Sequence, residues 1–174
     1  MADAAGTTAT TERLFLRRIS AMDAPYILEL LNEPAFHKNI GDKGVRSVAD
    51  ARRYIADVPV AHYRAYGYGA YLVCLRDSLQ PIGMCGLYQR ANLDKPDLGF
   101  ALSERFHGQG YAREASQAVL IHARRALGLS SLAAIVDPAN EASARLLHAL
   151  DFRRRGNFRL PDEDQDLDYY EIDL

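Results

Sequence analysis

The sequence has few of the features that mark a membrane, secreted or nucleic-acid-binding protein. No apolar run approaches the ~20 residues that a membrane-spanning helix needs. The start, MADAAGTTATTE, lacks the basic-then-apolar order of a secretion signal. A net charge of −2 leaves no general basic field to attract nucleic acid. We therefore expect a soluble, cytoplasmic protein without a nucleic-acid or membrane partner.

Cysteine is also scarce. The chain has two, Cys74 and Cys85, and no C-x-x-C pair. Both lie in apolar, strand-like runs, which favours buried free thiols over a disulfide or a metal site. Nothing in the sequence beside Cys85 suggests an activating base, so we expect neither a covalent cysteine mechanism nor a metal.

The 174 residues, about half of them apolar, are enough for one domain with a real core. We expect a flexible tail over residues 1–10 and a single domain over 11–174. Apolar periodicity and turn residues predict a mixed α/β sheet with helices on its faces. The predicted strands lie within 11–19, 67–75, 81–90, 95–103, 132–136 and 166–174, and the predicted helices within 20–33, 48–57, 111–127 and 138–152. Asp23 and Ser47 are the expected caps of the first two helices.

Residues 103–115, SERFHGQGYAREA, place two glycines directly before a predicted helix. Gly108 and Gly110 can take positive φ and let a ligand approach the backbone. The free N–H groups of a helix's first turn bind anions without a charged side chain. The stretch is neither a Walker loop nor a three-glycine dinucleotide fingerprint. From these residues alone it is either a phosphate or pyrophosphate site or an ordinary glycine-rich loop.

Three segments in this order resemble the GNAT superfamily of N-acetyltransferases. RFHGQGYA matches its coenzyme A signature, Arg/Gln-x-x-Gly-x-Gly/Ala, and GQGYAREA is close to the form found in ribosomal-protein N-terminal acetyltransferases. NEASARLLHALDF resembles the segment in which an asparagine opens the fourth helix, although Asp151 stands where the family has glycine. The resemblance covers residues 11–174. It implies a mainly antiparallel sheet with a splay between the fourth and fifth strands and helices on both faces.

The resemblance also implies where acetyl-CoA binds. Backbone N–H groups from Arg105 to Ala112 would hold the pyrophosphate, and the pantetheine arm would occupy the splay as a substitute strand. Arg105 and Arg113 would add charge or be solvated, and the His107 ring would face solvent. Asn140 would contact the pantetheine arm, cap a helix, or do both. The implied cofactor-binding residues are Phe100, Ala101, Leu102, Ser103, Arg105, His107, Gly108, Gln109, Gly110, Tyr111, Ala112, Arg113, Asn140 and Ser143.

Acetyl transfer to an amine needs a proton acceptor, an oxyanion donor and a proton for the thiolate. Asp97 is the expected base, with a solvated strand-end carboxylate as the alternative. Ser143 is the expected acid, because Leu147 stands where many relatives carry tyrosine; the alternative is a small residue that permits close packing. The backbone N–H near Phe100 is the expected oxyanion donor. Glu114 is expected to be a structural carboxylate.

The amine acceptor is the least determined part. By resemblance, the acceptor site would draw on Phe36, His37, Tyr68, Tyr88 and Tyr170, and the acids of PDEDQDLDYYEID would attract a cation or form a solvated turn. A peptide N-terminus, a polyamine, an amino acid and an aminoglycoside all stay open. The implied function is acetyl transfer from acetyl-CoA to a primary amine by direct attack in a ternary complex. The alternative is a non-catalytic acyl-CoA-binding sensor or assembly module. Either a monomer or a homodimer is compatible.

Overall fold

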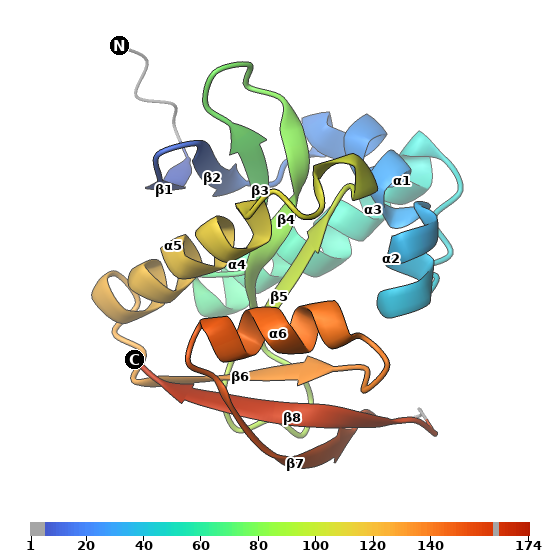
Figure 1. The fold of residues 1–174 in the computed structure, drawn as a ribbon. Helices are drawn as coiled ribbons and strands as arrows, with labels where there is room; N and C mark the ends of the chain where they lie inside the picture. The colour runs from blue at the N-terminus through green and yellow to red at the C-terminus, as the bar shows by residue number, and fades with distance from the viewer. Residues whose placement is uncertain (1–5, 162–163) are drawn as a thin grey trace.

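The computed structural model of the chain describes residues 6–161 and 164–174 (Figure 1). These residues form an eight-stranded sheet. The sheet is mostly antiparallel with helices on both faces, as the resemblance implies. Its order is β1-β2-β3-β4-β5-β6-β8-β7. The strands are β1 (Thr7–Thr10), β2 (Leu14–Arg18), β3 (Ala70–Leu75), β4 (Pro81–Tyr88), β5 (Asp97–Leu102), β6 (Ser131–Val136), β7 (Arg153–Arg159) and β8 (Asp166–Asp173). The α-helices are α1 (Ala24–Leu31), α2 (Pro34–Asn39), α3 (Val48–Ile55), α4 (Ala61–Tyr66), α5 (Tyr111–Arg125) and α6 (Glu141–Ala149).

Two hydrophobic clusters lie on opposite faces of the sheet. Strand β3 shows the alternation, because Tyr71 and Val73 join one cluster while Leu72 and Cys74 join the other. Helices α5 and α6 cover the first face, and α1, α2 and α3 cover the second. The predicted coenzyme A loop therefore leads into α5, which packs on one face of the sheet. The helices near the N-terminus, predicted to line the acceptor site, pack on the other face.

Two strands differ from the sequence prediction. Residues 7–10, assigned to the flexible tail, form β1, which pairs with β2 at the sheet edge; residues 1–5 lie outside the described chain. Strand β7 was also missed. It pairs antiparallel with β8 but carries four arginines and no apolar alternation, because most of its side chains are exposed.

The helix caps are confirmed in one case and corrected in the other. The Ser47 side chain accepts a hydrogen bond from the Asp50 N–H at the start of α3. Asp23 makes no side-chain cap to α1. It belongs instead to a short 3-10 helix, Ala21–Asp23, that Ser20 caps. Its carboxylate accepts hydrogen bonds from Nη1 and Nη2 of Arg17 at 2.9 and 2.6 Å. The side-chain cap is therefore Ser20, three residues before the predicted Asp23.

The acidic C-terminal segment is explained largely by ion pairs. Asp166 and Asp168 in β8 pair with Arg159 and Arg154 in β7, and Glu171 pairs with Lys95. Asp162 and Glu163 lie outside the described residues. Asp166 and Asp168 therefore join β7 to β8, while Glu171 joins β8 to the segment before β5.

Both cysteines are buried free thiols, as predicted. Burial raises the pKa of Cys85 to about 12 and that of Cys74 to about 11. Thiols this hard to ionise are poor nucleophiles. Within the described residues, no helix is both long and apolar enough to cross a membrane.

Candidate active site

The predicted splay lies between β5 and β6. Within the described chain these two parallel strands share one register pair, Asp97 with Ala133, beside a hydrogen bond of 2.9 Å from the Ala133 N–H to the Pro96 carbonyl. Figure 1 shows the strands running apart from this point. On its other edge β5 pairs with β4 along its whole length. The β6-facing edge of β5 beyond Asp97 is thus free of sheet pairing, which is the geometry that strand substitution requires.

The loop that follows β5 has the backbone that the glycine pattern predicts. Gly108 has φ +71° and Gly110 has φ +82°, in the left-handed region that favours glycine. Gly110 is the residue directly before α5, so its conformation sets the direction in which the helix begins. The loop residues from Glu104 to Gly110 are exposed apart from Phe106. The first turn of α5 can therefore present its backbone N–H groups to an anion in solvent.

The side chains of this loop mostly fold back onto the protein. His107 Nε2 lies 2.8 Å from the Leu102 carbonyl, so one ring nitrogen is turned toward β5 while the residue stays exposed to solvent. The Gln109 side chain donates to the Arg105 carbonyl at 3.0 Å. Arg105 stacks on the Phe106 ring, and Arg113 reaches the Ala149 carbonyl of α6 at 3.5 Å. A phosphate at this loop would therefore be bound chiefly by the backbone, as the resemblance implies.

Asn140 and Ser143 lie together at the start of α6. The Asn140 Oδ1 accepts from the Ser143 N–H at 3.1 Å, which confirms Asn140 as a helix cap. Both side chains are half-buried. Leu147, one turn further on, is fully buried in the core, so the position that holds tyrosine in many relatives serves packing here. Ser143 therefore supplies the hydroxyl group in the first turn of α6.

Asp97 is a buried, paired carboxylate. Its side chain is 1% exposed, and its two oxygens lie 3.0 and 2.9 Å from Nε of Arg90. Burial raises the pKa of Asp97 above its usual range, and the Arg90 guanidinium opposes that rise. The alternative of a solvated strand-end aspartate is therefore wrong. Asp97 sits at the point where β5 and β6 part.

The proposed acceptor residues fall into two groups. Phe36 and Tyr170 are buried in the two hydrophobic clusters, and the Tyr170 ring packs against His148. Tyr68 and Tyr88 are nearer to Asp97: Tyr88 is its register partner on β4, and the Tyr68 hydroxyl donates to Gln89. The Tyr88 ring lies over Gly99, where an added Cβ would approach a ring carbon to 2.6 Å. His37 lies 3.8 Å from Asp42.

Contacts between distant segments surround the loop, and the sequence does not predict them. The Tyr26 hydroxyl lies 2.9 Å from the Ser103 Oγ. The Glu33 carboxylate accepts from the Glu104 N–H at 2.8 Å, and the Glu104 carboxylate accepts from the Ala35 N–H at 2.7 Å. Their partners stand about seventy residues apart in the chain, and no local pattern joins them.

A sheet splayed beside a glycine-rich loop and helix N-terminus defines a candidate coenzyme A site. Residues 13–153 match the family model described as "Acetyltransferase (GNAT) domain". Uncharacterized N-acetyltransferase p20 of Bacillus licheniformis is 27% identical over 87% of this chain and 85% of its own. YoaA of Bacillus subtilis, an uncharacterized N-acetyltransferase, is 28% identical over 86% and 84%. The chain belongs to the GNAT acetyltransferase family.

Solved structures agree with this assignment. An acetyltransferase from Agrobacterium tumefaciens is 26% identical, with a TM-score of 0.78 over 94% of this chain and 92% of its own. RimL, a ribosomal L7/L12 alpha-N-protein acetyltransferase crystallised with coenzyme A, is 20% identical, with a TM-score of 0.82 over 97% and 98%. The second likeness shows the shared fold. Together with the family match, these likenesses support an acyltransferase that uses acetyl-CoA.

Proposed function

We propose that this protein transfers an acetyl group from acetyl-CoA to a primary amine, either a protein N-terminus or a small-molecule amine, by direct attack in a ternary complex. The observation that carries the proposal is the unpaired edge of β5 leading into a loop with two left-handed glycines and the N-terminus of α5. Direct attack is favoured because both thiols are buried and hard to ionise.

The residues fit the two halves of the cofactor. Backbone N–H groups between Arg105 and Ala112 would hold the pyrophosphate. Backbone groups of Phe100 and Leu102, which point away from β4, would bind the pantetheine arm, with Ala101 between them paired to β4. Ser103 contributes less directly, because its N–H donates to the Ile82 carbonyl at 2.9 Å. Asn140 and Ser143 face this arm from α6. Aligning the two substrates in this way can supply much of the rate enhancement.

Three groups of the chain would act on the reacting atoms. As the amine nitrogen attacks the thioester carbon, Asp97 accepts the amine's proton, directly or through water. The Phe100 N–H donates to the oxyanion. When the C–S bond breaks, Ser143 donates a proton to the leaving thiolate. A pKa raised by burial suits Asp97 to this role, since a base works best when its pKa lies near the working pH.

We retain Tyr88 and Tyr68 as acceptor-site residues, because Tyr88 is the register partner of Asp97 and the Tyr68 hydroxyl donates to Gln89, the residue after Tyr88. We leave Phe36 and Tyr170 to the core. Structural neighbours include a ribosomal L7/L12 acetyltransferase, a ribosomal-protein-S5-alanine acetyltransferase and a ribosomal-protein-serine acetyltransferase. Peptide N-termini therefore belong in any test of the acceptor.

The test measures thiol release from acetyl-CoA with a panel of N-terminal peptides, polyamines, amino acids and aminoglycosides, with mass spectrometry of the amine product. The proposal expects one free thiol for each acetylated amine. Coenzyme A binding without transfer to any amine would instead support the acyl-CoA-binding module. The N-acetyltransferase relatives do not favour that second function.

A further inference from the structure

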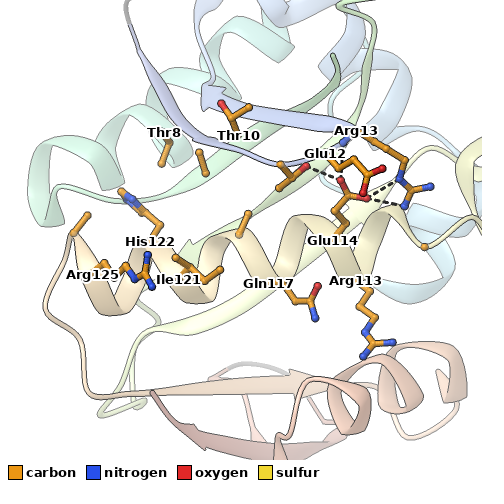
Figure 2. A pocket seen from close by; sticks show the side chains of 15 residues that line it. Thr8, Thr10, Glu12, Arg13, Arg113, Glu114, Gln117, Ile121, His122 and Arg125 are labelled. Carbon is orange, nitrogen blue, oxygen red and sulfur yellow. Dashed lines mark hydrogen bonds and ion pairs between the residues drawn. The ribbon is translucent and has the colours of Figure 1, made fainter. Parts of the chain in front are cut away.

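We propose that Arg13, outside the family's loop signature, is a positioning residue that sets the pyrophosphate-binding backbone; this inference rests on the proposed function. Arg13 lies just before β2, and its guanidinium reaches the loop ahead of α5. Its Nη1 donates to the Gln109 carbonyl at 3.0 Å. Its Nε and Nη2 each lie 2.7 Å from Oε2 of Glu114. Figure 2 shows this pair at one end of a hollow between β1 and α5.

The bond to Gln109 fixes the orientation of one peptide group. In a planar trans peptide, the carbonyl and the following N–H point in opposite directions. Because the Gln109 carbonyl is turned toward Arg13, the Gly110 N–H of the same peptide is turned away from it. Glycine on its own allows this peptide to adopt other orientations. The arginine therefore restricts the loop residue whose freedom would otherwise weaken a backbone anion site.

The ion pair with Glu114 has a second effect. Glu114 lies in the first turn of α5, where its negative charge would repel a bound pyrophosphate. Its Oε1 also accepts from the Thr11 hydroxyl at 2.6 Å and from the Arg13 N–H at 2.9 Å. Burial would raise the pKa of Glu114, but these hydrogen bonds lower it overall. The carboxylate is thus held on the β1–β2 side and its charge is balanced there.

Arg13 also packs on the helix start. Its guanidinium carbon lies 4.3 Å from the centre of the Tyr111 ring, the first residue of α5. A guanidinium combines a fork of donors with a flat face for stacking, which an ammonium does not. One side chain therefore holds the residue before Gly110, the residue after it and the first-turn carboxylate.

The test is calorimetry with coenzyme A on Arg13→Met, with Arg76→Met as the matched control. The Arg76 guanidinium donates to the Thr11 and Glu12 carbonyls of the same β1–β2 connection at 2.8 and 3.1 Å. We expect Arg13→Met to raise the Kd by about tenfold or more. The control should stay within about twofold of wild type. With an active acceptor, the KM for acetyl-CoA should rise in Arg13→Met while kcat at saturation is kept.

The outcomes separate this inference from the proposed function. A wild-type protein that does not bind coenzyme A overturns both. Wild-type binding that survives Arg13→Met overturns the inference alone, as does an equal loss in Arg76→Met. Full recovery in Arg13→Met combined with Glu114→Gln would also overturn it, because Arg13 would then act through charge balance without orienting the peptide. If Arg13→Met does not fold, Arg13→Lys takes its place and should show the same defect.

Discussion

Replacing Gly110 with alanine tests the backbone geometry of the loop, and Gly128→Ala is its matched control. Both glycines adopt the left-handed region, with φ +82° and +66°. An L-residue there costs about 1–2 kcal/mol. An added Cβ at Gly110 would lie 3.4 Å from the Arg13 guanidinium, whereas at Gly128 it would meet nothing within 4 Å. Gly128 follows the C-terminal end of α5. An alanine there meets the same backbone strain as at Gly110 but lies outside the coenzyme A loop.

At Gly110 the strain can appear in two measurable quantities. If the free loop keeps its conformation, Gly110→Ala lowers the free energy of unfolding by about 1–2 kcal/mol, or Tm by roughly 2–8 °C for a chain of this size. If the free loop relaxes, the same energy is required on binding, and the coenzyme A Kd rises by about 5- to 30-fold. We expect a binding loss of at least about fivefold, because the strained residue lies directly between the loop and the first turn of α5.

Thermal unfolding and calorimetry with coenzyme A measure both quantities on the same samples. Gly128→Ala should lower Tm and leave the Kd within about twofold of wild type. Any gain from a less flexible unfolded chain is common to the two variants and cancels in the comparison. The reasoning is refuted if folded Gly110→Ala binds coenzyme A as tightly as wild type, or if Gly128→Ala loses as much affinity as Gly110→Ala.

Three further predictions concern side chains. Asp97→Asn should lower kcat with little change in acetyl-CoA affinity and should remove one acidic limb of the pH–rate profile. Because burial raises the pKa of Asp97, that limb lies above pH 3.8. An unchanged profile would show that Asp97 is not the base. Ser143→Ala should lower kcat by roughly 10²–10⁴-fold if the hydroxyl protonates the thiolate, and a change under about twofold would reduce Ser143 to packing. Arg17→Met should cost about 1–2 kcal/mol of stability at pH 7 by removing two bonds to Asp23. Burial raises the pKa of Asp23, but hydrogen bonds from Arg17 lower it overall. In chemical denaturation, the difference in unfolding free energy between wild type and Arg17→Met should therefore fade as the pH drops below 3.8. A difference that persists in acid would contradict this.

The features that sequence predicted well are those set by local chemistry. Gly108 and Gly110 marked left-handed backbone, because no other residue adopts it as readily. Ser47 marked a helix start, and the apolar run of β6 marked a central strand. The resemblance then placed these pieces in one fold, and the splay between β5 and β6 followed.

The features that sequence missed depend on pairing between distant residues. Strand β7 has no apolar alternation, since its arginines pair with acids of β8. The sequence does not predict that Asp97 is buried, because its ion-pair partner Arg90 lies seven residues away with no pattern that joins them. Arg13 stands 101 residues from Glu114, and nothing in either local segment indicates that they meet. Charged residues are compatible with solvent and with ion pairs alike, so their roles emerge from the folded chain.

The most direct test of the account is the change in backbone amide NMR signals when coenzyme A is added to the ¹⁵N-labelled protein. We predict that the β5 amides of Phe100 and Leu102, which point away from β4, and the loop amides from Gly108 to Ala112 shift together and gain protection from hydrogen exchange. The exposed strand β7 should not respond. Tight binding that leaves both the β5 and loop amides unchanged would contradict the account, because the cofactor would then occupy another part of the molecule.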